Sequence, residues 1–188
     1  MTKLDNQTAE DVGLAFGGCL RDQIRFTTNE AARACNITMP FFAFMNPGPV
    51  REFKSLWCAL SQGIAIWTIL ENDPELRENE KALRKIIHNM QMYSEQVMAQ
   101  KVFNDLSNDQ RARYNSLKRD FLRMAMETTT MKFDFADTFL TYYHGASSKK
   151  ITDRTRSATV DQVDKVSKMF LNLYNVVAKH PVASKVAQ

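Results

Sequence analysis

Apolar residues recur at every third or fourth position through most of this 188-residue chain, and no segment alternates convincingly over the length of a strand. Such spacing places apolar side chains along one face of a helix. The chain also has only six glycines and five prolines, so helix-breaking residues divide it into a few long segments. The pattern therefore predicts an all-α fold, with roughly six or seven helices in a single compact domain.

The residues at segment ends indicate where the first helices begin. Thr8 is a candidate N-cap for the first helix, although Gly13, Gly17 and Gly18 lower the helix propensity of that segment. Thr28 is a candidate N-cap for a short second helix. A strong amphipathic helix is expected next, because its apolar stripe is regular: Phe53, Leu56, Leu60, Ile64 and Trp67.

Later helix boundaries follow from the same chemistry. Asp73 and Pro74 supply an N-cap and a first helical residue for the next helix. Residues 107–110, Ser-Asn-Asp-Gln, have the form of a capping box. A helix over about residues 130–144 should end at Gly145, because glycine is the usual residue just beyond a helix C-terminus.

One domain accommodates a chain of this length. Residues 1–10 are polar and are expected to form a flexible N-terminal arm, followed by a helical core over residues 11–181 and a C-terminal tail over residues 182–188. The N-terminal residues lack the apolar run of a signal peptide, and no stretch approaches the ~20 apolar residues of a membrane span. The three cysteines show no paired spacing, which favours a reducing compartment.

Few residue patterns suggest catalysis. The three histidines lie far apart, with no cysteine or carboxylate at metal-binding spacing, and the chain has no glycine-rich phosphate loop. Cys58 falls on the apolar face of a strong helix, where a packed thiol is far more common than a nucleophile. We therefore expect no enzyme activity, no metal site and no cofactor.

Basic residues are more informative. Lysine and arginine number 25 against 21 acidic residues, and the net charge of +4 permits nucleic-acid binding without requiring it. Residues 147–157, which we expect to form a loop, contain four cations and one anion together with several hydroxyls. Lys149, Lys150, Arg154 and Arg156 suit phosphate contacts from such a loop. A solvated loop with no ligand is the alternative, and composition alone favours it slightly.

A second basic cluster is expected on the helix after residue 107. It consists of Arg111, Arg113, Lys118, Arg119 and Arg123, partly offset by Asp109 and Asp120. Arg119 and Arg123 share a helix face at i,i+4, where they repel each other, and a bound anion would relieve that repulsion. A solvated helix face is the commoner explanation of this pattern.

Two charged residues of opposite sign interrupt apolar stretches. Arg84 follows Ala82-Leu83 and precedes Ile86-Ile87, while Asp134 lies between Phe133 and Phe135. Either charge would be costly to bury alone, whereas a buried pair can be tolerated. We therefore expect Arg84 and Asp134 to meet across the fold, with guanidinium donors left over for a phosphate or a base.

Both stretches resemble motifs of one protein family. Residues 81–90 resemble the "LRQ" helix of coat proteins from flexuous filamentous plant viruses, in the manner of potyviruses and potexviruses, and residues 131–139 resemble their "FDF" element. The order of the two motifs agrees, and a tryptophan-containing helix end at 66–72 and an Arg-x-Arg at 154–156 add weaker matches. The resemblance covers roughly residues 64–160. Closterovirus coat proteins share a similar separated arginine and aspartate, so the viral family stays open.

The resemblance implies a coat subunit that polymerises helically with identical subunits around single-stranded RNA of any sequence. It places such a protein in the virion and the host cytoplasm, with no membrane partner, and implies that Arg84 and Asp134 lie at the RNA groove. The family's serine after the tryptophan helix has no counterpart at residues 71–74. Together with the basic clusters, the expected RNA-binding residues are Arg84, Asp134, Lys118, Arg119, Arg123, Lys149, Lys150, Arg154 and Arg156.

An alternative function comes from a different class. The chain can instead be a helical adaptor or regulatory protein that binds a protein partner and no nucleic acid. Its partner site would then be the phenylalanine-rich segment from Pro40 to Pro49, which we expect to be free of helix. Arg84 and Asp134 would form a structural salt bridge in that case.

Overall fold

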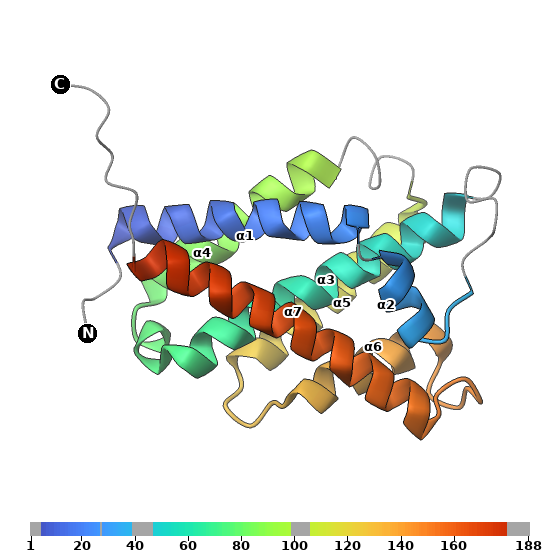
Figure 1. Cartoon of the computed structure of the whole chain (residues 1–188). Helices are drawn as coiled ribbons and strands as arrows, with labels where there is room; N and C mark the ends of the chain where they lie inside the picture. Colours follow the sequence, from blue (N-terminus) through green and yellow to red (C-terminus); the bar gives the residue numbers. More distant parts are fainter. Residues whose placement is uncertain (1–4, 27, 39–46, 99–105, 180–188) are drawn as a thin grey trace.

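The computed structural model describes residues 5–26, 28–38, 47–98 and 106–179 (Figure 1). Within these ranges the chain is helical and contains no strand, which confirms the all-α prediction. The elements are α1 (Asn6–Phe26), α2 (Thr28–Ala34), α3 (Pro47–Asn72), the 3-10 turn η1 (Pro74–Arg77), α4 (Glu80–Met98), α5 (Asn108–Met126), α6 (Lys132–His144) and α7 (Asp153–Lys179).

The helix α3 forms the centre of the fold. Every residue from Ser55 to Leu70 is buried, because α1, α5, α6 and α7 all pack against this helix. Figure 1 shows α7 crossing the molecule in front of it. The expectation that no stretch approaches a membrane span is wrong for α3, which among the described helices is long and apolar enough to cross a membrane. However, 94% of its apolar window is buried inside the fold. Such all-round burial is typical of a core helix.

Glycines allow two pairs of helices to approach closely. A Cβ at Gly17 of α1 would lie 2.7 Å from the Cβ of Tyr93 on α4, and one at Gly13 would lie 2.7 Å from the Ile86 carbonyl oxygen. On α3, a Cβ at Gly63 would lie 2.6 Å from the Cβ of Phe121 on α5. The glycines of α1 therefore do more than lower helix propensity, because they permit the contact between α1 and α4.

The first helix begins earlier than the sequence pattern indicates. Asp5 is the N-cap in place of Thr8, because its side chain accepts a hydrogen bond of 2.7 Å from the Thr8 backbone N–H. This bond lowers the pKa of the Asp5 carboxyl group. Residues 6–10 belong to α1, and Ala9 is fully buried, so assigning residues 1–10 to an arm is wrong for that part. Residues 1–4 and the expected tail over residues 182–188 lie outside the described residues.

Two further boundaries differ from expectation. Pro74 begins the short turn η1 rather than the next helix, and α4 begins separately at Glu80. The helix α3 already begins at Pro47, where a proline fits the first helical turn. The expectation that Pro40 to Pro49 is free of helix is therefore wrong for its last three residues. Residues 40–46 lie outside the described residues.

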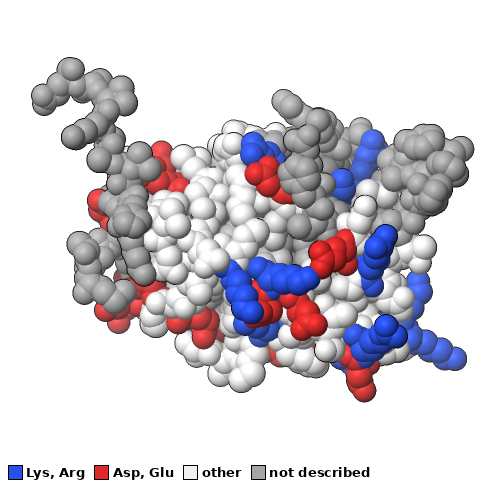
Figure 2. Space-filling model, viewed as in Figure 1, with Lys and Arg blue, Asp and Glu red and all other residues white. Residues whose placement is uncertain are grey.

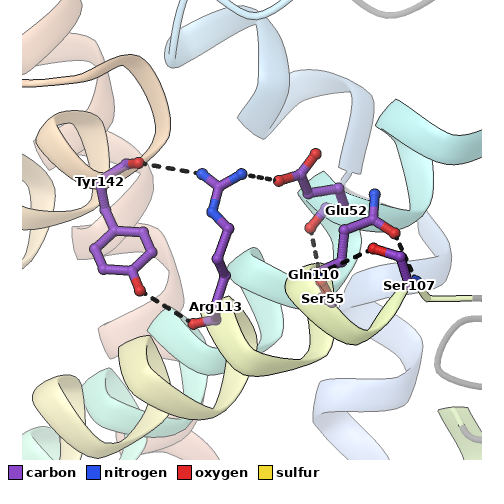
Figure 3. A network of polar contacts seen from close by, with 6 residues as sticks. All are labelled: Glu52, Ser55, Ser107, Gln110, Arg113 and Tyr142. Atoms are coloured by element: carbon purple, nitrogen blue, oxygen red, sulfur yellow. Dashed lines mark hydrogen bonds and ion pairs between the residues drawn. The ribbon is translucent and has the colours of Figure 1, made fainter.

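The predicted ends of α5 and α6 are confirmed. The Ser107 hydroxyl accepts from the Gln110 backbone N–H at 3.2 Å, and the Gln110 side chain accepts from the Ser107 N–H at 3.0 Å (Figure 3). This is the expected capping box. The helix α6 stops at Gly145, whose φ of 85° lies in the left-handed region that favours glycine.

Candidate nucleic-acid interface

The expected pair between Arg84 and Asp134 does not form. Arg84 Nη2 lies 2.5 Å from Glu80 Oε1 one turn earlier on α4, and its side chain is 76% exposed. Asp134, also exposed, accepts a hydrogen bond of 2.7 Å from the Met131 N–H at the start of α6. Each apolar stretch is one helix, and the charged residue lies on its solvent side while apolar neighbours such as Leu83 and Phe135 are buried. The burial that motivated the prediction is therefore absent.

This geometry predicts small and independent effects on stability. Replacing Arg84 by alanine should change the free energy of unfolding by less than about 0.5 kcal/mol, because exposed helical ion pairs contribute little. Replacing Asp134 should cost about 0.5–1 kcal/mol, because its carboxylate satisfies a backbone N–H at the positive end of α6. Urea denaturation of both single variants and the double variant should give additive changes. A coupling energy above about 1 kcal/mol between the two substitutions would instead show that Arg84 and Asp134 interact.

The cations after α6 remain together and face solvent. We call residues 149–156 the basic turn. Its residues Lys149, Lys150 and Arg154 are exposed, and within the described part of the chain none of them forms an ion pair. Arg156 differs, because its Nε lies 2.8 Å from Asp137 Oδ1 on α6. Three of the four cations expected to contact phosphate are thus available to a ligand, while the fourth, Arg156, links α7 to α6 through its ion pair.

The basic turn is only partly a loop, and its backbone is held in place. The helix α7 begins at Asp153, because the Thr152 hydroxyl caps it by accepting from the Thr155 N–H at 3.1 Å. The expected loop over residues 147–157 is therefore wrong beyond residue 152. The Lys150 N–H also donates to the Ser148 hydroxyl at 3.3 Å. These hydrogen bonds fix the backbone of the turn, while the side chains of Lys149, Lys150 and Arg154 stay exposed to solvent.

The short helix α2 packs beside the basic turn. Asn36 Nδ2 donates to the Lys150 carbonyl oxygen at 3.4 Å, and His144 Nε2 lies 2.8 Å from the Cys35 carbonyl oxygen. Arg33, in the last turn of α2, is exposed at this end of the molecule. Figure 2 shows blue side chains along the right side of the molecule, where Figure 1 places α2 with the start of α7 below it. The sequence pattern gave no indication of Arg33, because only the tertiary fold brings α2 to this turn.

The second basic cluster, on α5, is largely committed to contacts within the protein. Lys118 Nζ lies 2.5 Å from Glu95 Oε1 on α4, and Arg123 lies 3.3 Å from Asp120. Arg119 is exposed. Lys118 points toward α4, whereas the basic turn is held by the segment after α2 and by α6.

Arg113 is the member of this cluster with the most contacts inside the protein. Its guanidinium group pairs with Glu52 on α3 and donates to the Tyr142 carbonyl oxygen on α6 at 3.3 Å (Figure 3). The Tyr142 hydroxyl in turn donates to the Arg113 carbonyl oxygen at 3.4 Å. One arginine therefore joins three helices, and its charge is already paired within the protein.

Comparisons of the chain with protein-family models, with curated proteins and with solved structures found no match.

Among the residues that the structure describes, no group of three histidine, cysteine or acidic side chains is placed to hold a metal ion. Cys58 is fully buried, and burial raises the pKa of its thiol to about 12. A thiol with that pKa stays protonated at neutral pH, so Cys58 has the properties of a packed core residue.

Proposed function

We propose that this chain binds single-stranded RNA through the basic turn, without preference for sequence. The observation that carries this proposal is the exposure of Lys149, Lys150 and Arg154 on a backbone fixed by hydrogen bonds, with no ion pair among the described residues. Cations already paired with carboxylates must lose that contact before they bind phosphate, whereas these three need not. A compact group of such cations favours phosphate contacts, which carry no sequence information.

We propose further that the RNA-bound form is a helical polymer of identical subunits, as in the coat proteins that the motifs resemble. The all-helical core and the order of the two motifs support this part of the proposal. Arg84 and Asp134 are not oriented by each other, so we assign the principal phosphate contacts to the basic turn instead. A polymer also accommodates the modest charge of each subunit, because every subunit adds its own contacts along one RNA strand.

Electron microscopy tests the assembly directly. Purified protein mixed with single-stranded RNA at low salt should form rods in negative stain, and the length of the rods should increase with the length of the RNA. The protein without RNA serves as the control for rods that form unaided. Compact particles of one size with RNA of every length would exclude a helical coat.

An adaptor function is the second candidate, and an exposed apolar cluster favours it. Met126, Met131 and Phe133, around the connection from α5 to α6, have exposed fractions of 45%, 69% and 51%. Exposed apolar clusters of this kind often mark protein-binding surfaces. In this case RNA binding should be negligible even at low salt, and Phe133→Ser should weaken binding of a protein partner without reducing stability.

A further inference from the structure

The two ends of α7 lie next to turns of opposite charge. The basic turn, residues 149–156, includes the first helical residues of α7. Near the other end of the helix, the Tyr174 hydroxyl donates to Asp73 Oδ2 at 2.6 Å. Twenty residues of α-helix separate Arg154 from Tyr174, which corresponds to about 30 Å. Figure 1 shows the corresponding segments at opposite ends of the molecule.

The segment held by Tyr174 is strongly acidic. We call residues 71–80 the acidic turn; it contains five acidic residues and one basic residue. Asp73 is engaged by Tyr174, Glu71 lies 3.8 Å from Arg77, and Glu80 pairs with Arg84.

The two remaining carboxylates of the acidic turn are available for contacts with another molecule. Glu75 and Glu78 are exposed and form no ion pair within the described part of the chain. The 3-10 turn η1 carries Glu75 and ends just before Glu78, so the two carboxylates lie close together in the chain. Figure 2 shows acidic side chains without basic ones toward the left end of the molecule, whereas most basic side chains in view lie in its right half, with some acidic ones among them.

We propose that the acidic turn of one copy of this chain binds the basic turn of a second copy, head to tail. Glu75 and Glu78 would face Lys149, Lys150 and Arg154, which are opposite to them in charge and equally exposed to solvent. Because the two turns lie at opposite ends of α7, each copy in such a contact keeps one unused turn, and the pair as a whole presents one unused turn of each sign. A heterologous contact of this kind continues into an open row of copies rather than closing as a two-fold dimer.

This contact is a property of the RNA-free protein, and it rests on the proposed function in one respect, because RNA and the acidic turn of a neighbouring copy would compete for the same cations. An RNA strand presents many phosphates, each with one negative charge, whereas the acidic turn presents two free carboxylates, so RNA should displace the neighbouring acidic turn. The contact consists of exposed charges, which salt screens within about 10 Å at 0.1 M ionic strength. Self-association should therefore be strongest at low salt and disappear at about 1 M.

Charge reversal tests the pairing by sedimentation velocity. At low salt the wild-type protein should associate with increasing concentration, and E75K/E78K and K149E/K150E should each associate at least about tenfold more weakly. An equimolar mixture of the two variants should associate again, because every reversed turn then finds an opposite charge. E127K/D161K is the matched control, since it changes two exposed acids elsewhere and should associate nearly as the wild type does. Circular dichroism verifies that each variant is folded.

The outcomes separate this contact from the RNA proposal. A monomeric wild type at low salt, an E75K/E78K variant that associates normally, or a mixture that stays monomeric would each overturn the head-to-tail contact. Binding to a single-stranded oligouridine is measured in parallel. E75K/E78K should bind that RNA at least as tightly as the wild type. If K149E/K150E loses self-association but keeps its full RNA affinity, the contact stands and the RNA-binding proposal fails.

Discussion

A variant carrying Lys149→Gln, Lys150→Gln and Arg154→Gln should bind single-stranded RNA on the order of a hundredfold more weakly than the wild type at about 0.1 M salt. Each phosphate contact with a single strand contributes ~0.7 to the slope of log affinity against log salt, so three lost contacts should reduce that slope by about 2. Fluorescence anisotropy with a labelled oligouridine over a range of salt concentrations measures both quantities. The fold should be retained, because all three side chains are exposed.

A matched control separates this local effect from the change in total charge. Arg21→Gln, Lys81→Gln and Lys168→Gln remove the same three charges from exposed positions outside the basic turn. That variant should keep most of its RNA affinity and its salt slope. Equal losses in the two variants would mean that RNA responds to net charge alone and has no site at the basic turn.

A large effect on stability is expected at Gly17. Replacing it by alanine should destabilise the protein by about 1–3 kcal/mol, because the new Cβ would lie 2.7 Å from Tyr93 Cβ and 3.2 Å from the Met90 carbonyl oxygen. Neither atom is the end of a flexible side chain, so relieving the clash requires α1 and α4 to move apart. Urea denaturation gives the change in the free energy of unfolding.

The adjacent glycine provides a control in the same helix. A Cβ at Gly18 would approach only Tyr93 Cε1, at 3.9 Å, which is an ordinary contact. Gly18→Ala should therefore stabilise the protein by up to about 1 kcal/mol, since alanine has the higher helix propensity. If Gly17→Ala stabilises the protein to the same extent, the close approach of α1 and α4 is not required.

Features of the fold that depend on neighbouring residues in the chain could be predicted from the sequence. The capping box at Ser107 and Gln110 and the stop at Gly145 depend on residues within one turn, and both are present. The early start of α1 was missed because Asp5 and Thr8 are both good capping residues, and the sequence does not indicate which one the backbone uses. The close approach at Gly17 was missed because it depends on Tyr93, in another helix.

The candidate site was predicted less well, and the reason differs between residues. Arg84 has Glu80 four positions earlier, where an ion pair within one helix is expected. Asp134 lies in the first turn of a helix, where a carboxylate is favourable. Both charges are therefore accounted for within their own helices, without a pair between Arg84 and Asp134. The pairing of Arg156 with Asp137 and the position of Arg33 beside the basic turn depend on tertiary packing. The sequence alone could therefore identify the basic segment but not which of its cations are available.

Mapping the RNA contact on the wild-type protein tests the central claim most directly. The protein is cross-linked to single-stranded RNA, digested, and its nucleotide-bearing peptides are identified by mass spectrometry. The structure predicts cross-links within residues 147–156, with a second set around Arg33, because these segments lie together at one end of the molecule. Cross-links confined to the α5 residues Lys118, Arg119 and Arg123, or to Arg84, would contradict the assignment of RNA binding to the basic turn.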